Sequence, residues 1–196
     1  APGRVNLIGE HTDYNGGHVF PCAITLATYA WVKPRSDKKL RLYSDNFPKD
    51  GIRELDMTDL AYRGSDSWAN YVKGVFVYLA DLGFAFPHGM DIAFYGNIPN
   101  GSGLSSSASF ELLVGVIARK VYTLDIDTLG LVKVGKRVEN DFIGVNSGIM
   151  DQFAVGMGKK DHAIFLDCAT LEYELVPVTL GDYRIVIMNT NKRREL

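Results

Sequence analysis

The ten residues Pro99–Ala108, PNGSGLSSSA, separate two segments of different periodicity. Residues 90–95 are predicted to form a strand, and the apolar spacing after residue 108 predicts a helix ending near Tyr122. Glycines let backbone amides turn toward one point, and a helix start adds about half a positive charge, so the segment suits a phosphate group. It is neither a lysine-bearing Walker loop nor a dinucleotide fingerprint. An ordinary turn with an N-cap serine is the alternative.

A second polar segment lies at the start of the chain, where residues 1–18 are predicted to form a loop with a short apolar core at Val5, Leu7 and Ile8. Within it, 4–14 reads RVNLIGEHTDY and places two carboxylates and a histidine beside a glycine. Carboxylates accept hydrogen bonds from neighbouring hydroxyls, which is how proteins hold small polyols. The same side chains are an incomplete metal-ligand set. A solvated polar loop is the alternative.

The third segment is Gly144–Phe153, GVNSGIMDQF, with Glu139 twelve residues before Asp151. An acid in the first turn of a helix lies near the positive helix end, where its ionised form is stabilised. Such a carboxylate can orient a hydroxyl nucleophile or take its proton. In the alternative interpretation, Asp151 caps its own helix and Glu139 is a solvated helix residue.

The rest of the chain predicts one α+β unit without internal repeats. Neighbouring antiparallel strands are expected at 19–33, 40–43 and 52–55, and closing strands at 163–166, 171–176 and 183–188. Helices are expected at 68–82, 128–142 and 149–155.

Composition restricts the classes of partner. Twenty-one Lys and Arg against 23 Asp and Glu give a net charge of −2, which offers no field for nucleic acid or an anionic membrane. The basic cluster 192–194 is interpreted as a solvated chain end. The apolar, uncharged run 19–32 is too short to cross a bilayer. Only two cysteines are present, without zinc-site spacing, which favours an intracellular, cytoplasmic protein without disulfides.

Taken together, the three segments resemble the galactokinase family within the GHMP kinases of sugars and small metabolites. The resemblance is carried by 3–14 (GRVNLIGEHTDY), 99–108 and 148–153 (GIMDQF), with further similarity at 68–74 (WANYVKG). It runs over the whole chain. One departure is Ser147, where the family often has a cysteine before the Gly-Ile-Met-Asp run.

The resemblance implies a fold and roles for individual residues. The fold is the GHMP-kinase N-terminal domain, ribosomal protein S5 domain 2-like, with a mixed sheet and helices on one side. Galactose would be bound by Glu10, His11, Asp13, Asp151 and the backbone at Gly148, with Arg4 beside Asp151 as a second catalytic residue. The phosphates of ATP would lie against Gly101, Ser102, Gly103, Leu104, Ser105, Ser106 and Ser107, and the adenine near Trp68. Mg²⁺ would be held by Ser107 or Ser106 together with Glu139.

The implied activity is ATP-dependent phosphorylation of galactose at its 1-hydroxyl, the first committed step of galactose metabolism. Two alternatives remain: a catalytically weak sensor that binds galactose and ATP, and a kinase for N-acetylgalactosamine or another aldose. The intact serine run of 105–109 favours catalysis. The chain reads as an N-terminal domain, 1–196, cut at both ends. The family's C-terminal domain, third glycine motif and sugar-contacting tyrosine would lie beyond it, so these residues alone are expected to be inactive.

Overall fold

A mixed five-stranded sheet forms one layer of the structure. The computed structural model describes residues 1–99 and 101–188, so the basic cluster 192–194 lies outside the described residues, as does Asn100 in the glycine-rich loop. The strand order is β1 (Pro2–Asn6), β3 (Pro21–Pro34), β6 (Met90–Gly96), β4 (Lys39–Ser44) and β5 (Arg53–Asp56). Strands β4 and β6 are parallel, and every other neighbouring pair is antiparallel.

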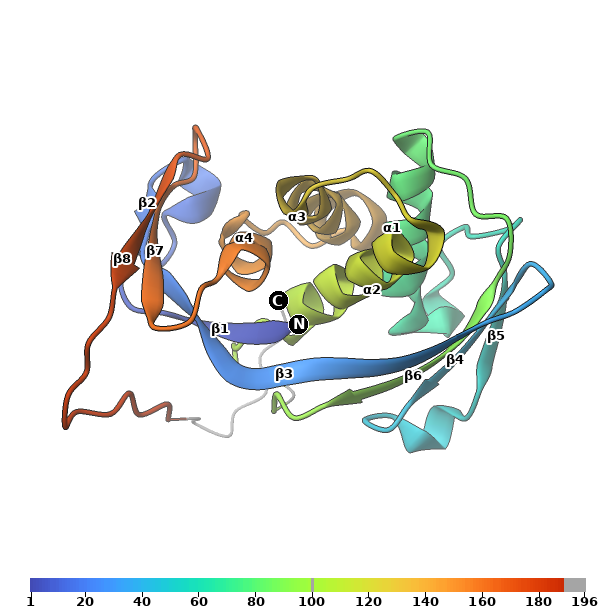
Figure 1. Ribbon diagram of the computed structural model, residues 1–196, viewed down its shortest axis with the longest axis horizontal. Helices are drawn as coiled ribbons and strands as arrows, with labels where there is room; N and C mark the ends of the chain where they lie inside the picture. Colours follow the sequence, from blue (N-terminus) through green and yellow to red (C-terminus); the bar gives the residue numbers. More distant parts are fainter. Residues whose placement is uncertain (100, 189–196) are drawn as a thin grey trace.

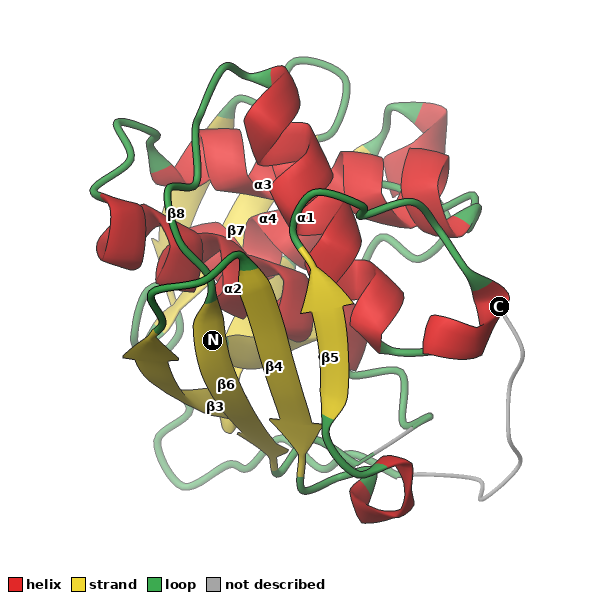
Figure 2. Ribbon diagram, turned by 90° about the vertical axis from the view of Figure 1, so that its right-hand side faces the viewer, coloured by secondary structure: helices red, strands yellow, loops and turns green. Residues whose placement is uncertain are grey.

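Four helices cover one face of this sheet, as expected for the α+β fold with helices on one side (Figures 1 and 2). They are α1 (Ala69–Asp81), α2 (Ser106–Tyr122), α3 (Thr128–Arg137) and α4 (Met150–Met157). Alternate residues of the strands point toward them, so that Leu40 and Leu42 of β4 and Ile92 of β6 are buried in the same main core as Phe76 and Leu79 of α1. Burial of this apolar face holds the layers together.

A second, three-stranded antiparallel sheet adjoins one end of the first (Figure 1). It consists of β2 (His18–Val19), β7 (His162–Asp167) and β8 (Tyr173–Pro177) in that order. Short 3₁₀ turns complete the described elements at Asp13–Asn15, Pro48–Asp50 and Gly64–Asp66. Among the described residues, no helix combines the length and the apolar character that crossing a membrane requires.

Three sequence expectations about strands are wrong. Strands β3 and β4 are not neighbours, because β6 inserts between them and pairs with both. The start of the chain is not all loop, since 2–6 forms β1. Its expected apolar core is also only partly formed: Val5 is buried, whereas Leu7 and Ile8 are exposed on the turn that follows.

The third error concerns residues 183–188, which form no strand in the part of the chain that the structure describes. A strand needs a partner for its backbone groups, and this segment finds none among the described residues. Its apolar side chains therefore face solvent, and Val186 and Met188 are 75% and 87% exposed.

The helix expected at 128–142 is divided in two. The α-helix α3 ends at Arg137, and the chain continues in a wider π-helical turn over Val138–Ile143. Such turns are rare and shift side chains relative to a regular helix, often at functional sites. Here the turn carries Glu139, which is buried and directed toward the start of α2.

Candidate functional site

The glycine-rich loop connects β6 to the start of α2. Gly101 and Gly103 have positive φ angles of 69° and 71°, and Ser105 at the N-cap position also has a positive φ of 59°. No side-chain hydrogen bond caps the helix, so the simple N-cap interpretation is wrong. The buried hydroxyl of Ser105 has no protein partner in the described part of the chain. The loop therefore leaves first-turn amides of a long helix free for an anion.

Arg4 joins this loop to Asp151. Its Nη1 atom donates to the carbonyl of Gly103 at 2.5 Å, while Nε and Nη2 contact Oδ1 of Asp151 at 2.9 and 2.6 Å. The backbone amide of Arg4 also donates to the carbonyl of Leu104 at 3.1 Å. One guanidinium group thus fixes the separation between the glycine-rich loop and the first turn of α4.

Glu139 lies at the other side of the loop, in contact with the first turn of α2. Its Oε1 atom accepts a hydrogen bond from the hydroxyl of Ser107 at 2.6 Å, and its Oε2 atom accepts one from Ser147 at 2.9 Å. No described hydrogen bond joins Ser106 to Glu139. A hydroxyl and a carboxylate side by side are hard oxygen donors of the kind that Mg²⁺ takes from proteins, the rest of its shell coming from phosphates and water. Ser107 and Glu139 therefore fit a magnesium ion bound together with a nucleotide.

Glu10 of the first segment lies on the same side of β1 as Arg4. Arg4 and Asn6 are two residues apart in a strand and so share a face. Arg4 holds Asp151, and Nδ2 of Asn6 donates to Glu10 at 3.0 Å. His11, with a positive φ of 61°, lies beyond them on the surface and contacts the hydroxyl of Tyr14 through Nδ1 at 2.7 Å.

Asp13 is packed directly against the backbone of Gly148. A Cβ atom added to Gly148 would overlap the carboxylate of Asp13, so only glycine permits this approach. The loop before Gly148 is held by Lys136, whose Nζ donates to the carbonyl of Ser147 and to Oδ1 of Asn140. Burial lowers the pKa of Lys136. The structure thus joins Asp13 to the 144–148 loop, although they are far apart in sequence.

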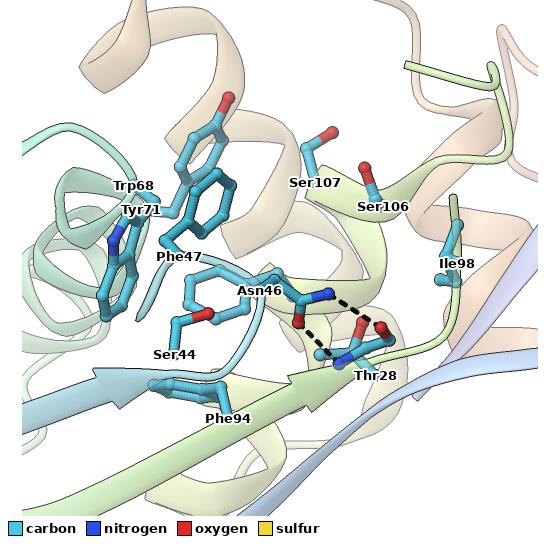
Figure 3. A pocket seen from close by; sticks show the side chains of 12 residues that line it. Thr28, Ser44, Asn46, Phe47, Trp68, Tyr71, Phe94, Ile98, Ser106 and Ser107 are labelled. Carbon is cyan, nitrogen blue, oxygen red and sulfur yellow. Dashed lines mark hydrogen bonds between the residues drawn. The ribbon is translucent and has the colours of Figure 1, made fainter. Parts of the chain in front are cut away.

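A pocket of about 190 Å³ opens beside the start of α2 (Figure 3). Aromatic side chains line one part of it: Phe47, Trp68, Tyr71, Phe94 and Phe110. Trp68 meets Phe94 and Phe110 edge to face, with ring centroids 6.1 and 6.0 Å apart, and its Nε1 donates to Asp50 at 3.0 Å. Ser106 and Ser107 lie at the opposite side of the pocket from Trp68. A flat apolar group in the pocket would therefore lie next to the glycine-rich loop.

Several residues of the site were not predicted from the sequence. Phe47, Phe94 and Phe110 had no signal beyond that of ordinary core residues. Asn46, which lines the pocket, is fixed by two hydrogen bonds to the backbone of Gly96, at 2.7 and 2.8 Å (Figure 3). Glu111 was also missed, and its position on the buried side of an amphipathic helix was the only signal available.

Two family models and several curated proteins match this chain. The family described as "GHMP kinases N terminal domain" matches residues 70–159, and the "Galactokinase galactose-binding signature" matches 1–34. The chain is 63% identical to a galactokinase of Enterococcus faecalis and 59% identical to one of Bacillus subtilis, in each case over all 196 residues. It covers 51% and 50% of these relatives, so it spans about half the length of the curated relatives it matches.

Solved structures superpose on this chain and share its fold. Lactococcus lactis galactokinase complexed with galactose superposes with a TM-score of 0.97 at 55% identity, over the whole of this chain and 50% of that one. The Methanococcus jannaschii mevalonate kinase superposes with a TM-score of 0.74 at 19% identity, over 88% of this chain and 53% of that one. The second likeness concerns the fold alone.

Proposed function

This chain belongs to the galactokinase family of GHMP kinases and corresponds to the N-terminal portion of its relatives, and from this premise we propose that it carries most of the site at which ATP phosphorylates galactose on its 1-hydroxyl. The observation that supports this proposal best is the single guanidinium group of Arg4, which bonds both the glycine-rich loop and Asp151. A phosphate on that loop and a hydroxyl on that carboxylate would be neighbours.

Asp151 is the proposed base. Arg4 contacts only its Oδ1 atom, and no described hydrogen bond uses Oδ2, which is available to the sugar. In the reaction, the 1-oxygen of galactose forms a bond to the γ-phosphorus of ATP as the bond from that phosphorus to ADP breaks, and the hydroxyl proton moves to Asp151. Phosphoryl transfer depends mainly on this in-line placement and on neutralising the phosphate charge.

Three features of the chain would neutralise the negative charge of the phosphates. The amides at the start of α2 and Arg4 lie at the glycine-rich loop. Ser107 and Glu139, with Ser106 as a neighbour, would hold Mg²⁺. The metal would supply charge neutralisation to the transferred group. Because Mg²⁺ is usually bound through one or two protein oxygens together with substrate phosphates, the nucleotide would complete its shell.

The sugar would lie between Asp151 and the residues Glu10, His11, Asp13 and Gly148. Changing Gly148 to Ala is expected to raise the dissociation constant for galactose about 10- to 100-fold, because the new Cβ displaces the Asp13 carboxylate and a charged hydrogen bond is worth about 1.5–3 kcal/mol. Isothermal titration with galactose measures this, using the complete gene product that contains this sequence.

A matched control is Gly64→Ala, since a Cβ on Gly64 meets nothing within 4 Å. That variant is expected to bind galactose like the parent. Equal galactose affinity for Gly148→Ala and the parent would remove Asp13 and Gly148 from the proposed sugar site.

The adenine would occupy the aromatic pocket beside Trp68. Trp68→Ala is expected to weaken ATP binding about tenfold or more, because an aromatic contact with a base is worth about 1–3 kcal/mol. Binding of a fluorescent ADP analogue measures the change. Trp31→Ala is the matched control, since Trp31 is exposed on β3, outside this pocket. If both variants bind the analogue equally well, the adenine does not lie at Trp68.

One experiment tests the proposed function as a whole. ADP release is measured with ATP and a panel of galactose, N-acetylgalactosamine and glucose, and phosphorus NMR locates the phosphate on the product. We expect release with galactose and a 1-phosphate product. Binding of galactose and ATP without ADP release would instead indicate a sensor, and preference for another aldose would correct the substrate.

A further inference from the structure

Gln152 connects two buried carboxylates from different parts of the chain. It follows Asp151 in the first turn of α4 and has no exposed surface. Its Nε2 atom donates to Oε2 of Glu111 at 3.0 Å and to Oε2 of Glu139 at 2.9 Å. A primary amide has two hydrogens. Gln152 therefore uses one for each carboxylate and has none left for any other group.

The carboxylate of Glu139 is held from both ends as a result. Its Oε2 atom accepts from Gln152 and from Ser147, while its Oε1 atom accepts from Ser107 on the side of the nucleotide pocket. Rotation of the carboxylate would break the two bonds at Oε2 in the protein interior, where unpaired polar groups are costly. Gln152 and Ser147 thus fix the plane of the carboxylate and the direction in which its other oxygen points toward Ser107.

Glu111 holds the amide in place and is itself tightly packed. Only 1% of Glu111 is exposed, and a Cβ added to Gly135 of α3 would lie 3.1 Å from its Oε2 and 3.0 Å from Cγ of Gln152. The absence of a side chain at Gly135 is what lets α2, α3 and α4 approach around the pair. Burial, reinforced by the nearby charges of Glu139 and Asp151, raises the pKa of Glu111 well above its usual range.

A neutral Glu111 is compatible with this geometry. Its Oε2 atom accepts from Gln152, as a carbonyl oxygen of a protonated carboxyl or of an amide would. A second negative charge so close to Glu139 would be costly in the interior. The arrangement therefore keeps a hydrogen-bond acceptor at residue 111 without requiring a charge there.

We propose that Gln152, held by Glu111, is a positioning residue that aims the Glu139 carboxylate at the magnesium ion of the bound nucleotide. This inference deepens the proposed function and rests on it, since Ser107 and Glu139 are the proposed metal ligands. Neither Gln152 nor Glu111 contacts Ser107 in the described hydrogen bonds, so both act through Glu139. Groups that orient a metal ligand commonly change metal affinity about 10- to 100-fold when they are removed.

The direct test is binding of Mn²⁺ in the presence of ADP, measured by the loss of the free-ion signal in electron paramagnetic resonance. The complete gene product that contains this sequence is used. Gln152→Met keeps the length and removes both hydrogen bonds, and is expected to raise the Mn²⁺ dissociation constant about 10- to 100-fold. The concentration of Mg²⁺ giving half-maximal activity is expected to rise in parallel, whereas galactose affinity changes less than twofold.

A second pair of variants separates positioning from folding. Glu111→Gln keeps the acceptor and is expected to bind Mn²⁺ within about threefold of the parent, whereas Glu111→Ala is expected to resemble Gln152→Met. Asn70→Ala serves as the stability control: this buried side chain bonds the backbone of Arg63, and neither bond involves Glu139 or Gln152. It is expected to lower the unfolding temperature and leave Mn²⁺ binding unchanged.

The outcomes distinguish the two proposals. If the parent binds Mn²⁺ with ADP and Gln152→Met does so equally well, the positioning role is wrong although the kinase proposal stands. If Gln152→Met does not fold, the Glu111 pair decides: equal Mn²⁺ affinity for Glu111→Ala and Glu111→Gln overturns the inference, and a difference of tenfold or more supports it. A parent that binds Mn²⁺ with ADP but produces no phosphorylated sugar contradicts the proposed function instead.

Discussion

Replacing Asp151 with asparagine is expected to lower kcat for galactose phosphorylation about 1000-fold, within the range typical of a lost general base. The new amide keeps the size of the side chain and one acceptor oxygen for Arg4, so the local packing is preserved. It cannot accept the proton of the 1-hydroxyl. Galactose affinity is expected to change less than tenfold, because the proposed sugar site also includes the residues of the 10–13 segment. Stopped-time assays of ADP release and calorimetric titration with galactose separate the two quantities.

The matched control is Asp125→Asn, which changes an exposed acid in the turn after α2. It is expected to turn over like the parent. Arg4→Met should also lower kcat more than galactose affinity, since Arg4 bonds Asp151 and the loop at Gly103 but none of Glu10, His11 or Asp13. Unchanged turnover in Asp151→Asn would show that another group takes the proton.

Local pattern was enough to predict most of the elements. The strand at 90–95 and the helices beginning near 69 and 106 have regular apolar spacing over several turns or alternations, and the structure forms all three. Strand order was not predictable in the same way. Insertion of β6 between β3 and β4 depends on pairing between segments about 50 residues apart, and the side-chain pattern of a strand does not specify its neighbour.

For the candidate site, too, local sequence motifs were predictive, whereas contacts between distant segments were not. Short motifs identified Arg4, Asp151 and the glycine-rich loop, because residue type and spacing carry chemical information there. The pocket wall was missed, since Phe94 alternates with the rest of β6 and Phe47 lies in a turn. Gln152 and Glu111 were missed for another reason: a buried polar network depends on three elements approaching, and each residue alone resembles a solvated one. The roles of all these residues stay predictions until variants are measured.

Residues 1–196 on their own are expected to show no measurable turnover, whereas the same chain followed by the C-terminal half of the Enterococcus faecalis relative is expected to phosphorylate galactose. The physical reason is exposed apolar surface next to an open site. Ile8, between β1 and the proposed sugar-binding residues, is 72% exposed, and Tyr183 in the 183–188 segment is 81% exposed. Large apolar side chains exposed to this extent are often covered by another part of a protein.

In the shorter chain, water would reach the terminal phosphoryl group and the sugar from the uncovered side, and both positioning and charge neutralisation would weaken. The measurement compares ADP release by the two chains at equal concentration, with circular dichroism showing whether the shorter one is folded. Asp151→Asn in the longer chain is the control that activity comes from the site described. Full turnover by residues 1–196 would mean that this chain closes the site by itself and that no C-terminal half is needed for catalysis.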